Sequence, residues 1–122
     1  MDRARFEELV TQTVKSLPDE FLNRLDNIDV IVEDQATVTQ LRKSRLKANQ
    51  ILLGLYEGVP RTKRGSGYGL VLPDKITIFQ KPIEVLCRTE EEIVAEIGRV
   101  VKHEIAHHFG ISDARLHELG RY

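Results

Sequence analysis

The feature that most constrains this fold is the segment from Thr89 to Gly110, which has the pattern of one long, capped amphipathic helix. Thr89, followed three residues later by Glu92, forms a capping box, in which the hydroxyl and the carboxylate satisfy backbone N–H groups at the helix start. Isoleucine and valine then recur at helical spacing up to Ile105. Gly110 provides a stop in the left-handed conformation. A face this broadly apolar requires other elements to pack against it.

The remaining segments predict helices mixed with short strands. We expect helices over 3–16, 18–25 and 113–119, strands over 28–34, 51–60 and 75–80, a short helix or a mobile connection over 37–50, and an exposed flexible loop over 61–69. The strand KITIFQ (75–80) alternates, so we expect it to have one exposed face. Without regular βαβ alternation, this order predicts an α+β fold. The length of 122 residues predicts one domain, 1–122.

Composition narrows the class of protein. Hydrophobic residues make up 41% and charged residues 30% of the chain, which is typical of a soluble globular protein. The lone cysteine, Cys87, excludes an intramolecular disulfide and a cysteine-rich zinc finger. The charged N-terminus has no signal-peptide pattern, and no apolar run reaches the length of a membrane span. We therefore expect a cytoplasmic protein without a membrane partner.

The chemistry is concentrated in the sequence HEIAHHFG, residues 103–110. On a helix, His103 and His107 are one turn apart, so their imidazoles can converge on one Zn²⁺ ion. Glu104 lies beside them and can take a proton from water activated by the metal. H-E-x-x-H on a helix is the metalloprotease signature that this mechanism describes. Glu104 is therefore the predicted catalytic residue.

Asp113 follows the turn at Gly110 and is the predicted third metal ligand, although it is also suited to capping the last helix. Three protein ligands leave a position for water, which favours a catalytic over a structural site. His117 is a weaker rival for the third ligand. His108 points about 100° away from His107 and is expected to pack or hydrogen-bond instead of binding metal.

HEIAHHFGISDARLHELG, together with LLGLYEGVP, LPDKITIFQKPIE and LPDEFLNRLDNIDVIVED, resembles the minimal zincin-like metallopeptidase family of small single-domain bacterial proteins. The resemblance runs from about residue 5 to the C-terminus. It implies a minimal zincin-like α+β fold, in which a small mixed sheet packs against helices that include the HExxH helix. It also implies His103 and His107 as zinc ligands, Glu104 as general base and Asp113 as third ligand. It brings no known substrate. The longer metzincin proteases share the glycine turn, but this chain has Asp where they have a third His and lacks their Met-turn.

The leading hypothesis is zinc-dependent hydrolysis of a peptide or protein substrate, with the peptide added along KITIFQ as an extra strand. Tyr68, His117 and Tyr122 are candidate oxyanion donors. A non-catalytic zinc-binding partner protein is the first alternative, because few residues follow Asp113 to form a far cleft wall. A metal-dependent nuclease is the second, since basic side chains gather in 42–64, but a nucleic-acid partner is less expected. Nothing in the sequence predicts an oligomeric state.

Overall fold

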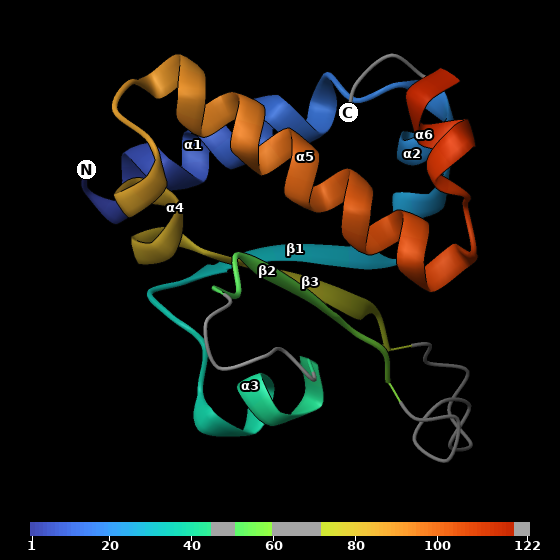
Figure 1. Cartoon of the computed structure of the whole chain (residues 1–122), viewed down its shortest axis with the longest axis horizontal. Coiled ribbons are helices and arrows are strands. Elements are labelled where there is room, and N and C mark those ends of the chain that lie inside the picture. Colours follow the sequence, from blue (N-terminus) through green and yellow to red (C-terminus); the bar gives the residue numbers. More distant parts are fainter. Residues whose placement is uncertain (45–50, 60–71, 119–122) are drawn as a thin grey trace.

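The structure is a computed structural model that describes residues 1–44, 51–59 and 72–118. Helices and short strands alternate irregularly along the chain (Figure 1). In order, the elements are α1 (Arg3–Lys15), α2 (Asp19–Leu22), the 3₁₀ turn η1 (Asn23–Leu25), β1 (Ile28–Glu33), α3 (Val38–Ser44), β2 (Gly54–Glu57), β3 (Asp74–Phe79), α4 (Gln80–Leu86), α5 (Glu90–Phe109) and α6 (Asp113–Glu118). The fold is α+β, as the sequence predicts.

The predicted ends of α5 are confirmed. The Thr89 hydroxyl accepts a hydrogen bond from the Glu92 backbone N–H at 3.1 Å. The Glu92 carboxylate accepts from the Arg88 N–H at 2.6 Å, so it satisfies the donor one residue before the cap. Gly110 ends the helix with φ of 72°, a conformation that glycine adopts without the steric cost of a Cβ atom. Local sequence therefore determines both ends of the helix that carries the candidate site.

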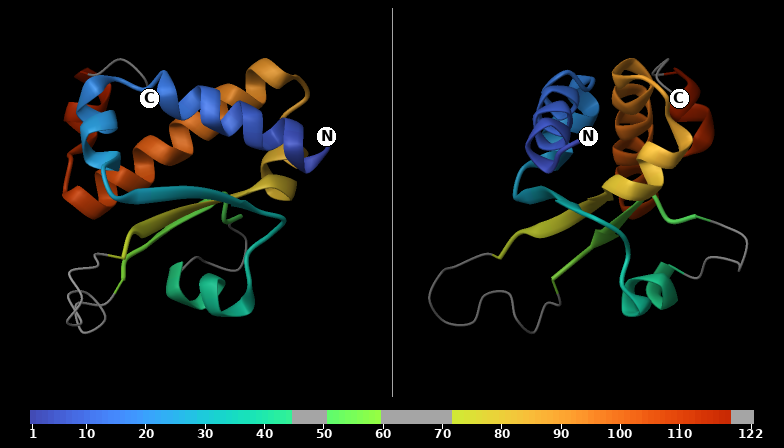
Figure 2. Two further views of the ribbon diagram at one scale, coloured as in Figure 1. Left: turned by 180° about the vertical axis from the view of Figure 1, so that it is seen from behind. Right: turned by 90° about the vertical axis from the view of Figure 1, so that its left-hand side faces the viewer.

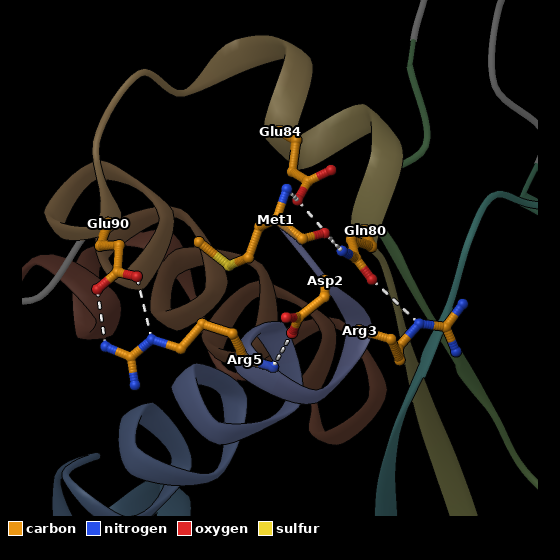
Figure 3. Close-up of polar contacts among 7 residues, drawn as sticks. All are labelled: Met1, Asp2, Arg3, Arg5, Gln80, Glu84 and Glu90. Carbon is orange, nitrogen blue, oxygen red and sulfur yellow. Dashed lines mark hydrogen bonds and ion pairs between the residues drawn. The ribbon is translucent and has the colours of Figure 1, made fainter.

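Polar contacts join the start of α1 to α4 and α5 (Figure 3). Arg5 lies on α1 and donates to the Glu90 carboxylate at the start of α5, at 2.7 Å. Arg3 donates to the Gln80 side-chain oxygen at 3.0 Å, and the Gln80 amide donates to the Met1 carbonyl at 2.9 Å. These contacts tie segments about eighty residues apart in sequence to one end of the helical layer.

The sheet has the strand order β1-β3-β2, with β1 parallel and β2 antiparallel to β3. The predictions that KITIFQ has an exposed face and offers an edge to a peptide are therefore wrong. This segment forms most of β3, the central strand, and Thr77 and Phe79 are as fully buried as Ile76 and Ile78. A central strand has neighbours on both edges, so β1 and β2 are the outer strands of the sheet that the described residues form.

Helices α1, α4 and α5 lie on one face of the sheet, and α3 lies on the other side (Figures 1 and 2). Helix α1 packs against α5, which in turn contacts β2 and β3. The core between them is contiguous and includes Phe6, Phe21, Ile76, Ile78, Ile97, Val101 and Ile105. The apolar face of α5 is thus buried, and the line of residues beside it, which includes Val100 and Glu104, faces β2.

Candidate metal and active site

His103 and His107 lie one turn apart near the C-terminal end of α5. Their ring centres are 5.9 Å apart and the ring planes are nearly perpendicular, at 85°. Two imidazoles on one tetrahedral zinc ion, with Zn–N distances of about 2.1 Å, have ring centres about 5 Å apart. The separation is therefore close to what a shared ion needs, and neutral imidazole is a donor that zinc accepts readily. The two residues fit the predicted ligand role.

Glu104 is hydrogen-bonded to a strand rather than to another side chain. The backbone N–H of Tyr56 in β2 donates to Glu104 Oε1 at 2.8 Å. No second hydrogen bond to the Glu104 carboxylate occurs within the described part of the chain. One carboxylate oxygen is thus fixed by the strand while Oε2 is left for other chemistry.

The environment of Glu104 alters its acidity. Burial raises the pKa of this carboxyl above its ordinary value, and this effect exceeds two opposing ones. The opposing effects are the hydrogen bond from the Tyr56 N–H and the charge of His107, both of which favour the ionised form. A carboxylate with a raised pKa is a stronger base than one in water.

Tyr56 joins β2 to the end of α5 in two further ways. Its ring stacks on His108 with centres 3.8 Å apart and planes at 14°. Its hydroxyl donates to the largely buried carboxylate of Asp74 at 2.5 Å. His108 is therefore a packed histidine, as the sequence predicts. The site role of Tyr56 was missed, because its contacts reach residues 18, 48 and 52 positions away.

Gly54 lets α5 approach β2 closely. A Cβ atom at this position would lie 2.4 Å from Val100 Cγ1 and 3.2 Å from the Thr77 carbonyl oxygen. Val100 lies one turn before Glu104, so the absence of a side chain at Gly54 sets how near the carboxylate comes to the strand. Periodicity alone identifies Val100 as a core residue but not its partner.

A cleft of about 210 Å³ opens between the helix and the strand. Residues 51–54 form one side, and Arg99, Val100, His103, Glu104 and His107 form the other. All three motif residues therefore face one hollow. Polar side chains that converge beside apolar ones in a hollow are features of a ligand or substrate site.

The other predicted site residues lie partly outside the described region. Asp113 is the first residue of α6, three residues after Gly110, but its side chain is outside the described residues. The cap of α6 is Ser112 instead of Asp113, because the Ser112 hydroxyl accepts from the Arg115 N–H at 3.1 Å.

The side chain of His117 is also outside the described residues, and Tyr68 and Tyr122 lie entirely outside. Among the side chains that are described, no three histidine, cysteine or acidic residues gather in the manner of a metal site. The third ligand stays a prediction.

The basic segment 42–64 is described only in part. Its residues Arg45, Lys47, Arg61, Lys63 and Arg64 lie outside the described residues. Lys43 on α3 pairs with Glu57 of β2 at 3.1 Å. The charge of Lys43 is therefore paired within the protein.

Comparison with known families identifies the class of protein. A sequence model of the zincin-like metallopeptidase family matches residues 25–121, which is most of the chain. No curated protein matches the chain. The chain belongs to the zincin-like metallopeptidase family. Membership supports a zinc metallopeptidase as the general class of protein.

Among the described helices, none combines the length and the apolar character that crossing a bilayer demands.

Proposed function

We propose that this protein hydrolyses peptide bonds with a zinc ion held by His103, His107 and Asp113, and with Glu104 as general base. The observation that carries the proposal is the Glu104 carboxylate, fixed at Oε1 by the Tyr56 N–H inside the cleft that His103 and His107 also line. A carboxylate with that restraint is oriented before substrate arrives. Orientation of a proton acceptor is a main source of catalytic rate.

When bound, zinc lowers the pKa of a coordinated water and polarises the carbonyl of the peptide bond. Glu104 would take up the proton at Oε2, because Oε1 is engaged by the Tyr56 N–H. The same oxygen then delivers the proton to the leaving amine nitrogen. This base-then-acid sequence needs only one carboxylate.

The peptide is expected along β2, which replaces our expectation of KITIFQ. The Phe79 N–H donates to the Leu53 carbonyl at 2.9 Å, so the peptide groups of Leu53 point toward β3. Peptide groups alternate in direction along a strand, so those of Leu55 and Glu57 point toward β3 as well.

The peptide groups of Gly54 and Tyr56 therefore point to the outer edge, where the Tyr56 N–H is already engaged by Glu104. The Gly54 N–H and the carbonyls of both residues are the groups that would pair with a peptide. An extended peptide adding to this edge brings its carbonyl groups to the cleft.

The test is a cleavage profile by mass spectrometry on a mixed peptide library, with the zinc-loaded wild type and Glu104→Gln. We expect cleavage by the wild type and a rate about 10²–10⁴-fold lower for Glu104→Gln. The matched control is Glu91→Gln, an exposed carboxylate in the first turn of the same helix, which should cleave like the wild type. Full activity in Glu104→Gln, or no cleavage by wild type with zinc bound, would overturn the proposal.

A further inference from the structure

The cleft beside the motif has an apolar wall. Ile51, Leu52 and Leu53 line it from the segment before β2, and Val100 adds an aliphatic group from α5. Apart from the motif residues, Arg99 is the only charged residue among the described residues that line this cleft, and its guanidinium pairs with Glu96 on the same helix. A substrate side chain that binds against this wall contacts aliphatic groups.

A second hollow, of about 370 Å³, adjoins the first. Ile51 and Leu52 line both, and the second is completed by Gln35, Ala36, Leu41 and Pro82. It has no charged group among its described lining residues. The two hollows therefore meet at Ile51 and Leu52, with His103, Glu104 and His107 in the first and Leu41 and Pro82 in the second. We refer to the two adjoining hollows together as the groove.

The groove leaves apolar side chains in water. Ile51 is 55% and Leu41 is 44% exposed. The free energy falls when a ligand covers exposed aliphatic groups on a concave surface. A peptide held at the candidate active site is the ligand that would reach these groups, because the second hollow adjoins the first at Ile51 and Leu52. Because the lining side chains are apolar, the substrate side chains that bind against them should be apolar too.

We propose that the substrate is a peptide with an aliphatic residue next to the cleaved bond, seated against Ile51, Leu52 and Val100, and a second apolar residue that lies against Leu41 and Pro82. This inference rests on the proposed peptidase function, because only a peptidase places the first residue next to a cleaved bond. The pairing of two apolar residues on one extended segment is a property of sequences that are buried in folded proteins and exposed when they unfold.

The test compares two fluorescein-labelled decapeptides that differ only in two leucines replaced by serines. Anisotropy titrations use zinc-loaded Glu104→Gln, so binding is measured without turnover. We expect the leucine peptide to bind about tenfold tighter or more, since apolar pockets discriminate by at least this factor. Ile51→Arg should remove the difference. The control is Val85→Arg, which changes an aliphatic residue that is 80% exposed and lines neither hollow.

The two proposals fail in different ways. If leucine and serine peptides bind equally, or Ile51→Arg leaves the difference intact, the groove assignment is overturned even where the wild type cleaves peptides. If the leucine peptide binds selectively but the wild type cleaves nothing, the groove assignment as a peptide site stands and the peptidase proposal fails. If the groove assignment is right, the cleavage profile of the wild type should be enriched in aliphatic residues next to the cleaved bond. In Ile51→Arg the preference at that position should shift toward acidic residues.

Discussion

The backbone N–H of Tyr56 donates to Glu104 Oε1 at 2.8 Å, joining the edge strand β2 to the helix that carries the candidate zinc ligands. The donor is a main-chain group, so no substitution at position 56 other than proline removes it directly. Its position depends instead on how β2 is held against α5. The stack of Tyr56 on His108 and the bond from its hydroxyl to Asp74 are two of those restraints.

Tyr56→Phe should destabilise the protein by about 1–3 kcal/mol, because the buried Asp74 carboxylate loses a hydrogen-bond donor. Asp74 keeps the bond from the Val59 N–H at 2.9 Å, so folding should persist. Urea unfolding of Tyr56→Phe, Asp74→Asn and the double variant measures the coupling. The two losses of unfolding free energy should not add in the double variant. Losses that add would contradict a direct contact between Tyr56 and Asp74.

Gly54→Ala should destabilise the protein by about 1–3 kcal/mol through overpacking against Val100. In a Val100→Ala background the loss should shrink by about 1 kcal/mol, but not vanish, because the Thr77 carbonyl also lies within 3.2 Å of the new atom. Gly98→Ala is the contrast. Its Cβ meets only Thr13 Cγ2 at 3.4 Å, so helix propensity should stabilise it by about 0.5–1 kcal/mol. Thermal and urea unfolding give all three values, and equal effects at Gly54 and Gly98 would argue against the close approach.

Zinc should raise the thermal midpoint of the wild type, because a ligand that binds only the folded state stabilises it by about 2.7 kcal/mol at a free concentration about 100 times its Kd. EDTA should reverse the rise, and His103→Ala or His107→Ala should abolish it. His108→Phe keeps an aromatic ring to stack on Tyr56 and should respond to zinc as the wild type does. Metal content by mass spectrometry accompanies the scans. An undiminished zinc response in both alanine variants would remove the two histidines from the ligand set.

Helix α6 should be held less firmly against α2 in acid. Arg115 donates to both Glu20 oxygens, at 2.9 and 3.3 Å, and α2 and α6 lie side by side in Figures 1 and 2. The hydrogen bond from Arg115 holds the pKa of Glu20 below its ordinary value of 4.5. The contact therefore acts at pH above 4.5 and is lost as the pH falls through the lowered pKa.

Backbone order parameters of residues 113–118 from ¹⁵N relaxation measure this docking. They should fall in acid for the wild type, and should be low already at neutral pH for Glu20→Gln. Arg5→Gln breaks the Arg5–Glu90 contact at the other end of the helical layer and should leave α6 ordered. If Glu20→Gln leaves these parameters at their wild-type values at pH 7, the ion pair does not hold α6.

Cys87 should alkylate slowly. Burial, and to a smaller extent the charges of Glu96 and Glu92, raise the pKa of the thiol above its ordinary value. Because the thiolate is the nucleophile, its reaction with iodoacetamide at pH 8 should be slower than that of a short cysteine peptide, with a rate profile displaced to higher pH. Glu96→Gln should recover only part of the difference, and urea should abolish it. Coincident profiles for folded protein and peptide would contradict the shift.

Much of the fold is readable from local pattern. The spacing from Phe6 to Val14 predicts α1, and the capping box with Gly110 predicts α5 to within a residue. The error at KITIFQ has a physical cause. Alternation of Ile76 and Ile78 with Thr77 describes the strand's faces, whereas its place between β1 and β2 depends on pairing with segments about 20 and 45 residues away. The nearly continuous apolar run ending at Phe79 is the signal typical of a strand buried on both faces.

The sequence by itself determined the helix, its ends and the placement of His103, Glu104 and His107 on it, because helical geometry is local and sets side-chain directions over four or five residues. Only the tertiary structure decided what faces them. The Tyr56 N–H, the close approach at Gly54 and the apolar wall of Ile51 and Leu52 come from chain segments about fifty residues away. Burial of the apolar face of α5 on the sheet brings them together, and that packing has no signature within either segment alone.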